Sequence, residues 1–441
     1  MEMIHQAGQY VDTVKRVCDA VGGEVTFRGT VHRVRDMSDF AFVIMRVERG
    51  LIQCTFQGDE IGGIKRADIR DAMVLEVSGK VHEEPRAEHG VEVVLSAVKV
   101  LGRPYDKLPV PLGKKYMGLS LDVDLPLRPI TLRHPRKQAV FRIQGAIADG
   151  FAQYMQSQGF THIHTPKIVV AGAEGGANLF KLDYFGKKAE LGQSPQFYKQ
   201  TMVGVYDRVF ETAPVFRAEK HNTTRHLNEY TSLDFEMGYI DGFEDVMAME
   251  TGMLQYVMKL LERDYKKELA MLDVTLPDVS RIPAVRFDEA KKLASEKYGR
   301  KIRNPYDLEP EEELLIGRYF KEECGSDFVF ITHYPSKKRP FYAMDDPADP
   351  RFTLSFDLLF RGLEVTTGGQ RIHDYQEILA KMEKRGMDPE DIASYLMIFK
   401  YGMPPHGGLG IGLERLTMRL LDEQNVREAA MFPRDVTRLE P

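Results

Sequence analysis

The sequence lacks several features that would assign it to a class of protein at once. It has only three cysteines among 441 residues and no CxxC spacing, so neither a disulfide framework nor a zinc site is indicated. No apolar run reaches the roughly eighteen residues that span a bilayer, and the N-terminus has no apolar core typical of a signal peptide. We therefore expect a cytoplasmic protein without a membrane anchor.

Excess positive charge is also missing. The net charge of −6 gives no general attraction to nucleic acid, so an RNA partner would have to be held by local basic patches. The chain has no internal repeat and no low-complexity tract. Its length and its hydrophobic fraction of 43% are sufficient for two or three domains with cores.

The N-terminal region is rich in short strand patterns. Five such runs, separated by turn residues, lie between about residues 25 and 100. This strand count predicts a small closed β-barrel, and an oligonucleotide-binding (OB) barrel is one of several barrels that have it. The proline-rich segment that follows has no sustained periodicity and is predicted to be a linker over 105–135.

The rest of the chain, 136–441, has the pattern of an α+β domain. It opens with a long amphipathic helix whose apolar stripe runs from Val140 to Met155 and which Gly159 ends. The strand patterns beyond it are separated by loops or helices rather than by regular βαβ units, which favours a large antiparallel sheet. We expect an insertion in this domain at about 268–340.

One predicted hairpin, "FRAEKHNTTRHLNEYTSLDFEM", carries an unusual density of charge. Alternation along its strands gives each strand one apolar and one charged face. The charged face gathers Arg217, Glu219, Tyr230, Asp234 and Glu236, with a basic loop between the strands. A solvated surface with ion pairs would also explain this pattern.

Two further clusters indicate a bound nucleotide. In "FDLLFRGLEVTTGGQRIH", Asp357 and Glu364 with a threonine hydroxyl are suitable oxygen ligands for magnesium, which usually also binds substrate phosphate. "GGLGIGLERL" leads into a helix that bears Arg415; it is not a P-loop, and its glycines could serve packing alone. With Arg217, these clusters suggest a base flanked by arginine and phosphates met by arginine and metal.

Taken in order, these segments resemble a known family. "FTHIHTPKIV", the charged hairpin and "GGLGIGLERL" are similar to the three signature motifs of class II aminoacyl-tRNA synthetases. "AEGGANLF", "GQSPQFYKQ", "GGQRIH", "YGMPPHGG" and "FPRDVTRLEP" narrow the resemblance to aspartyl-tRNA synthetases of the archaeal and eukaryotic type. It implies a five-stranded OB-fold anticodon-binding barrel at 1–104, a hinge at 105–135 and a class II antiparallel sheet with flanking helices at 136–441.

The resemblance implies a reaction in which the carboxylate of L-aspartate attacks the α-phosphorus of ATP and the aspartyl group then passes to the 3′ end of tRNA(Asp). The attacking carboxylate is already a nucleophile, so positioning and charge neutralisation should dominate. By family position Arg217 would hold the α-phosphate, Glu219 the adenine amino group, and Tyr230 with Arg415 the two faces of the ring. The expected catalytic residues are Arg217, Arg415 and Glu364, and the outer phosphates would meet Arg225 and His226.

The same resemblance implies an aspartate subsite and a magnesium site. Lys199 and Arg371 would bind the side-chain carboxylate, with Asp234 orienting the lysine. Two donors that cannot accept a hydrogen bond discriminate against an amide. The remaining candidates for aspartate binding are Glu174, Gln196 and Thr367. The implied Mg²⁺ ligands are Glu364, Thr367 and Asp357, and Thr367 stands where the family often has serine.

In the barrel, the resemblance points to a surface that reads the anticodon. Phe42 would stack on the middle base, while Gln53 and Glu92 would contact base edges. Alternation places Phe42 on the face opposite Ala41 and Val43. An aromatic residue in such a strand is otherwise usually part of the core.

The tRNA partner and the assembly are further expectations. His32, in what we predict to be a loop, stands where relatives that charge only tRNA(Asp) tend to carry tryptophan, so an enzyme that also charges tRNA(Asn) is the favoured hypothesis. His32 could instead be an ordinary solvent-facing residue. The apolar helix stripe and the first motif predict a homodimer. The alternatives are an asparaginyl-tRNA synthetase, an aspartate–ammonia ligase, or a non-catalytic RNA-binding relative.

Overall fold

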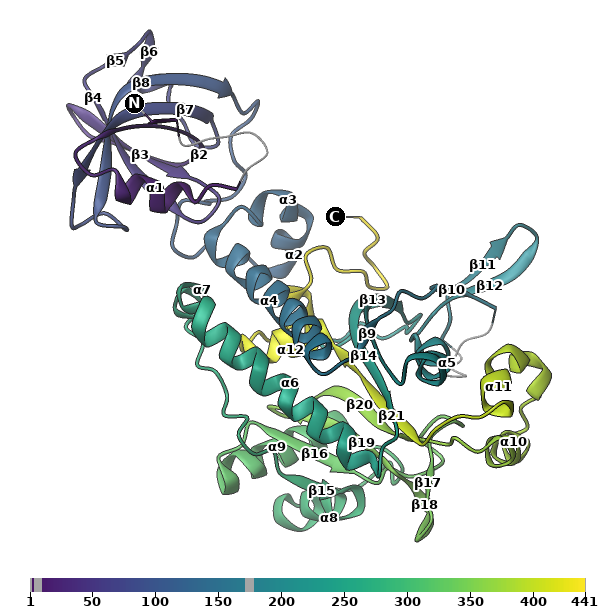
Figure 1. Ribbon diagram of the computed structural model, residues 1–441. Helices are drawn as coiled ribbons and strands as arrows, with labels where there is room; N and C mark the ends of the chain where they lie inside the picture. The colour runs from purple at the N-terminus through teal and green to yellow at the C-terminus, as the bar shows by residue number, and fades with distance from the viewer. Residues whose placement is uncertain (1, 4–9, 171–177, 441) are drawn as a thin grey trace. The chain divides into compact units, whose positions relative to one another are not determined.

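The computed structural model describes residues 2–3, 10–170 and 178–440, which form two compact units, Met1–Lys137 and Gln138–Pro441. In the first unit five strands close into a barrel, because β2 pairs with both β3 and β7 (Figure 1). The order around the barrel is β2 (Glu24–Asp36), β3 (Phe40–Arg46), β4 (Leu51–Gln57), β8 (Val91–Gly102) and β7 (Val74–Glu83). The five-stranded OB-type barrel expected from the sequence is confirmed.

The barrel strands follow the alternation of their side chains. In β3, Ala41, Val43 and Met45 are buried in the barrel core, whereas the residues between them are only half-buried. Short elements complete the unit: β1 (Glu2–Met3), α1 (Thr13–Asp19), β5 (Glu60–Ile61), β6 (Ile64–Lys65) and η1 (Arg66–Asp68). The segment expected to be a plain linker contains α2 (Leu121–Asp124), η2 (Leu125–Leu127) and α3 (Arg128–Thr131).

The second unit is built on an eight-stranded sheet. Its order is β15 (Ala284–Arg286), β16 (Phe328–Thr332), β19 (Ser355–Phe360), β20 (Leu363–Arg371), β21 (His406–Gly412), β14 (Glu229–Gly238), β13 (Arg208–Phe216) and β9 (Thr161–His162). The inner pairs are antiparallel, as predicted, but both edge strands, β9 and β15, pair in parallel. The sheet is therefore mixed rather than wholly antiparallel.

Helices pack against this sheet and around its ends (Figure 1). They are α4 (Pro135–Ser157), α5 (Gln196–Tyr206), α6 (Phe243–Asp264), α7 (Lys266–Leu272), α8 (Phe287–Tyr298), α9 (Pro310–Cys324), α10 (Tyr375–Lys384), η3 (Pro389–Ile392), α11 (Ala393–Lys400), α12 (Leu413–Leu420) and η4 (Val426–Ala429). Two small sheets lie outside: β10 (Ile168–Val169) with β12 (Lys187–Leu191) and β11 (Lys181–Tyr184), and β17 (Asp345–Asp346) with β18 (Asp349–Thr353). Within the described part of the chain, no helix is long and apolar enough to cross a membrane.

The predicted helix stripe is present but serves the unit's own core. Val140, Ile143, Ile147, Phe151 and Met155 are all buried within the single chain. Because intrachain packing already covers these side chains, the stripe gives no argument for a contact with a second copy. That part of the sequence reasoning was wrong.

Candidate active site

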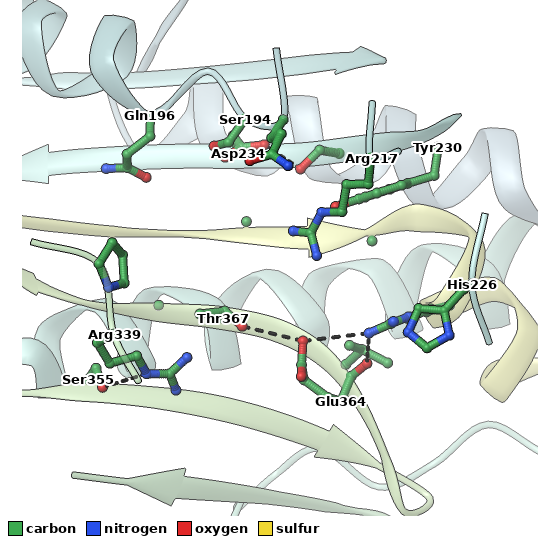
Figure 2. Close-up of a pocket in the computed structure, with 18 of the residues that line it drawn as sticks. Ser194, Gln196, Arg217, His226, Tyr230, Asp234, Arg339, Ser355, Glu364 and Thr367 are labelled. Carbon is green, nitrogen blue, oxygen red and sulfur yellow. Dashed lines mark hydrogen bonds and ion pairs between the residues drawn. The ribbon is translucent and has the colours of Figure 1, made fainter. Parts of the chain in front are cut away.

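A cavity of about 340 Å³ opens over the central strands of the eight-stranded sheet. Its walls come from β14, β20, β21, α5, the loop that joins β13 to β14, and the loop before β17. Figure 2 shows Gln196, Arg217 and Tyr230 along one side and Thr367 and Glu364 along the other. The clusters that the sequence indicated therefore surround a single space.

One end of the cavity holds two buried cations. Lys199 Nζ donates to Asp234 Oδ1 and to the Leu409 carbonyl, both at 2.8 Å. Arg371 Nε donates to Glu236 Oε1 at 2.8 Å, and its Nη2 donates to the Gly408 carbonyl at 2.9 Å. Lys199 and Asp234, expected to pair, do so.

Glu236 is a site residue to which the sequence analysis assigned no role. It is fully buried, and its carboxylate links the two cations, since Lys199 Nζ lies 3.3 Å from Oε2. Burial acts to raise the pKa of Glu236, but Arg371 and Lys199 outweigh it and hold that pKa below its usual range. Gln196 Nε2 also donates to Glu236 Oε2, at 3.4 Å. The only sequence feature that could have indicated a role for Glu236 is its place on the charged face of the hairpin.

The glycines of "GGLGIGL" make room for these carboxylates. Register pairs Glu236 with Gly408 and Asp234 with Gly410 across β14 and β21. A Cβ at Gly408 would lie against Glu236 Oε2, well inside contact distance, and one at Gly410 would lie 3.1 Å from Asp234 Oδ1. At Gly408 the same Cβ would also meet the Phe235 carbonyl, so the glycine-rich strand serves both the close approach of β14 and the placing of the site carboxylates.

At the other end of the cavity, arginines gather around one aromatic ring and one carboxylate. The Arg217 guanidinium carbon lies 5.5 Å from the centroid of the Tyr230 ring. Arg415 Nη1 donates to the Glu364 carbonyl at 3.1 Å and lies 3.5 Å from its Oε1. Burial favours a higher pKa for Glu364, yet Arg415, Arg339, Arg217 and Arg225 together hold it below its usual range. An anionic ligand would meet concentrated positive charge here.

The three expected magnesium ligands are placed differently from one another. Thr367 Oγ1 donates to Glu364 Oε1 at 3.4 Å, so these two oxygens lie side by side on the cavity wall. Asp357 is buried and accepts from Arg339 Nη2 at 2.6 Å; burial raises its pKa to about 6 despite that cation. Arg339, which lines the cavity and also donates to Ser355 Oγ at 3.1 Å, was missed by the sequence analysis.

Glu364 and Thr367 fit a magnesium ion that takes most of its ligands from water and phosphate. Among the described residues no group of three or more His, Cys, Asp or Glu side chains could hold a metal. Mg²⁺ bound by one or two carboxylates together with substrate phosphates does not need such a group. The donor set therefore suits a metal that arrives with a nucleotide.

The hairpin loop brings the remaining candidates to the cavity. Arg225 and His226 both line it, together with Glu219. Burial, with Arg415 nearby, lowers the pKa of His226 to about 4, so its ring is neutral at physiological pH. Arg225 Nη2 is bound by Glu313, from α9, through both carboxylate oxygens at 2.9 and 2.7 Å. Glu174 lies outside the described residues.

In the first unit, three of the four anticodon candidates share one surface. Phe42 is half-buried and not part of the core, and its ring meets Phe40 edge-on at 5.1 Å. Gln53 Nε2 and Thr55 Oγ1 both donate to Glu92 Oε2, at 3.1 and 3.0 Å. The outer face of β3, β4 and β8 therefore presents an aromatic ring beside a network of amide, hydroxyl and carboxylate groups.

The position of His32 differs from both expectations, a loop residue that reads the anticodon and an ordinary solvent-facing residue. It lies within β2, at a bulge where the register to β3 shifts between Val31 and Arg33, and it is buried. It is therefore neither in a loop nor facing solvent. Burial, with His134 and Arg46 nearby, lowers its pKa to about 4, so the imidazole is neutral. A single extra residue in a strand leaves no clear signal in the sequence.

The fold and the site together define a class of protein, the class II aminoacyl-tRNA synthetases, and sequence comparison agrees. The family described as "tRNA synthetases class II (D, K and N)" matches residues 120–436, and "OB-fold nucleic acid binding domain" matches residues 25–101. The chain belongs to this family. Relatives named as aspartate–tRNA ligases are 39–46% identical to nearly the whole chain. Within the family the chain is therefore an aspartate–tRNA ligase, which activates L-aspartate with ATP and transfers it to tRNA(Asp).

Named relatives cover nearly the whole chain. An "Aspartate--tRNA(Asp/Asn) ligase" of Thermus thermophilus is 46% identical, over 96% of this chain and 97% of that protein, and one of Deinococcus radiodurans is 45% identical, over 95% and 96%. An "Aspartate--tRNA(Asp) ligase" of Pyrococcus horikoshii is 40% identical, over 95% and 97%.

Solved structures of the same fold include both amino-acid specificities. The asparaginyl-tRNA synthetase of Pyrococcus horikoshii with asparaginyl-adenylate matches with a TM-score of 0.88 and 29% identity, over 96% of this chain and 97% of that one. The aspartyl-tRNA synthetase of Entamoeba histolytica matches with a TM-score of 0.86 and 28% identity, over 100% and 96%. The overall fold therefore does not separate the two activities, and the side chains of the site must.

Proposed function

We propose that this aspartate–tRNA ligase charges both tRNA(Asp) and tRNA(Asn). The observation that carries the proposal is that His32 is a buried and neutral ring. By the family resemblance, a larger side chain at this position would shape a pocket for one base. The two anticodons differ only in their third base, cytosine or uracil. A buried imidazole supports the wall of such a pocket from behind, and a ring smaller than an indole there would leave space for either pyrimidine. The Thermus and Deinococcus relatives carry names with both tRNAs.

Charging of purified transcripts of both tRNAs, side by side, tests this proposal. We expect efficiencies that differ by less than about tenfold, or roughly 1.4 kcal/mol. An efficiency for the tRNA(Asn) transcript lower by about a hundredfold or more, on the order of 3 kcal/mol, would overturn it. His32→Gln keeps a neutral side chain with a donor and an acceptor and should leave the ratio unchanged.

We further propose which residues of the cavity bind aspartate. Lys199 and Arg371 bind the side-chain carboxylate of aspartate, Asp234 and Glu236 hold those cations in place, and Gln196 borders the same pocket. An amide substrate would turn its NH₂ group toward fixed donors and lose a hydrogen bond. This pair of cations supports an aspartate enzyme over an asparagine enzyme. The α-carboxylate is left free to react.

At the nucleotide end, the proposed roles follow the charges. Arg217 neutralises the α-phosphate while the carboxylate attacks in line, and Tyr230 and Arg415 hold the adenine. The proposed magnesium, held by Glu364 and Thr367, would neutralise the phosphates that leave as pyrophosphate. His226 is neutral and can donate a hydrogen bond to the outer phosphates.

A homodimer is the proposed assembly. With the helix stripe excluded, support comes from the segment after Pro166, where Ile168 is 48% and Val170 is 85% exposed. Apolar side chains this exposed beside a first-motif strand suit a two-fold contact with a second copy. Light scattering over a range of concentrations should give the mass of two chains. A mass of one chain at every concentration would contradict the proposal.

A further inference from the structure

The region expected as an insertion places one buried carboxylate behind Arg225, a residue that lines the nucleotide end of the cavity. Glu313, on α9, has only 4% of its surface exposed. Besides the two bonds from Arg225 Nη2, its Oε2 accepts from the backbone N–H of Glu364 at 3.2 Å. A single carboxylate thus joins three segments that are far apart in sequence: the hairpin loop, α9 and β20.

This carboxylate is fixed in position because α9 lies directly on the turn between β19 and β20. A Cβ at Gly317 would stand 2.5 Å from the Gly362 nitrogen and 2.7 Å from its Cα. A Cβ at Gly362 would stand 2.8 Å from the Leu314 Cα. Helix and turn therefore touch backbone to backbone, which fixes the α9 backbone that carries Glu313 beside Arg225.

The loop that bears Arg225 is also held from its other sides. Arg415 Nε donates to the Arg225 carbonyl at 3.1 Å, and the Val426 N–H donates to the Thr224 carbonyl at 2.8 Å. Arg225 Nε is buried and has no hydrogen-bond partner among the residues that the structure describes. The guanidinium is thus anchored through Nη2 and lines the cavity with donor capacity left over.

We infer that Glu313 is a positioning residue for ATP, which acts by holding the Arg225 guanidinium ready for the phosphates. The inference rests on the phosphate-binding role expected for Arg225. A long, flexible side chain loses freedom when it binds a ligand, and a carboxylate that has already ordered it removes most of that loss. Besides Arg339, which lines the cavity directly, the 268–340 region would then contribute to the reaction by holding the nucleotide site in place through α9.

Glu313→Gln keeps the size of the side chain and removes its charge. ATP–pyrophosphate exchange compares the variant with the parent at one fixed pH. We expect the KM for ATP to rise roughly tenfold, with kcat within about twofold and the KM for aspartate unchanged. Arg225→Gln should raise the KM for ATP to a similar extent, and the double variant should add little to either single variant.

The neighbouring residue provides a matched control. Glu312 is also buried on α9, but its Oε2 accepts from Lys291 Nζ at 2.5 Å and from the Glu309 N–H at 2.8 Å, away from the cavity. Glu312→Gln should lower the thermal stability and leave the KM for ATP unchanged. This variant separates a general loosening of α9 from the loss of one contact.

Each of the other possible results contradicts a different part of the proposal. If Arg225→Gln raises the KM for ATP and Glu313→Gln does not, the positioning role is wrong while the role of Arg225 stands. If neither variant changes that KM, the phosphate role of Arg225 fails and the inference fails with it. If Glu312→Gln raises the KM as much as Glu313→Gln does, α9 acts only as a packing element.

Discussion

At the scale of single residues, the site is a set of charges that compensate one another before any substrate arrives. Lys199 and Arg371 are both paired with buried carboxylates, Asp234 and Glu236. Such pairs are held by geometry, and removing one member leaves its partner buried and uncompensated. A variant at this site therefore changes stability and specificity together, and its design has to separate the two.

Lys199→Met should lower aspartate-dependent ATP–pyrophosphate exchange by about a hundredfold or more, because one cation orients the substrate carboxylate less well than two. The lost charge also leaves Asp234 uncompensated, so the unfolding temperature should fall. Adding Asp234→Asn should restore much of the stability and none of the exchange activity. Near-normal exchange in a folded Lys199→Met variant would show that Lys199 does not bind aspartate.

Glu250 shows how a buried carboxyl group can make stability depend on pH. It lies on α6, is fully buried, and accepts from Thr366 Oγ1 at 2.6 Å; among the described residues its Oε2 has no partner. Burial raises its pKa to about 8, and the nearby Asp357 adds to this. The folded protein therefore keeps a proton that the unfolded chain releases near pH 4.5, and stability falls as the pH rises between these two values.

Glu250→Gln removes this titration and keeps an oxygen for Thr366. The variant should melt at nearly the same temperature as the parent at pH 5 and at a higher temperature at pH 8, since each unit of pKa shift corresponds to about 1.4 kcal/mol. Thermal unfolding at several pH values measures the difference. A difference that stays constant from pH 5 to pH 8 would mean that Glu250 is ionised in the folded protein.

At the scale of elements, alternation along a strand predicted which of its side chains share a face. It did not predict which side chains from distant elements would contact that face. The charged face of the hairpin and the placement of Phe42 opposite Ala41 and Val43 follow from a period of two residues. The outward position of Phe42 was implied by the family resemblance alone. The hydrogen-bond partners of Arg225 and Asp357 do not follow from this period, because Glu313 and Arg339 come from other elements. Glu313 is 88 positions from Arg225 in the sequence. The bulge that buries His32 and the intrachain cover of the helix stripe are likewise properties of packing.

The glycine strand β21 gives an element-scale prediction. Gly408→Ala places a methyl group against both Glu236 Oε2 and the Phe235 carbonyl of the neighbouring strand, and should destabilise the catalytic unit by roughly 1–3 kcal/mol, as overpacking usually does. It should also raise the KM for aspartate, because Glu236 supports both cations. Gly145→Ala, on an exposed part of α4 with nothing within 4 Å of the added Cβ, is the control. It should be neutral or stabilising, since alanine favours a helix.

At the scale of the whole molecule, the cavity and the barrel surface proposed to bind the anticodon lie in different compact units. The catalytic unit, Gln138–Pro441, contains the entire cavity, and the barrel unit, Met1–Lys137, contains the surface around Phe42. Amino-acid activation uses only ATP and aspartate, whereas transfer also requires tRNA. A change on the barrel surface should therefore affect the second step alone.

Phe42→Ala tests this separation. Stacking of a base on an aromatic ring contributes about 1–3 kcal/mol, so the KM for tRNA should rise by roughly 5- to 150-fold. ATP–pyrophosphate exchange without tRNA should stay at the parent level. Tyr105→Ala, in the same unit, is the control, because that ring is 99% exposed and lies outside the barrel strands. An unchanged KM for tRNA in Phe42→Ala would remove Phe42 from the anticodon surface, and a loss of exchange would show that the units are coupled before tRNA binds.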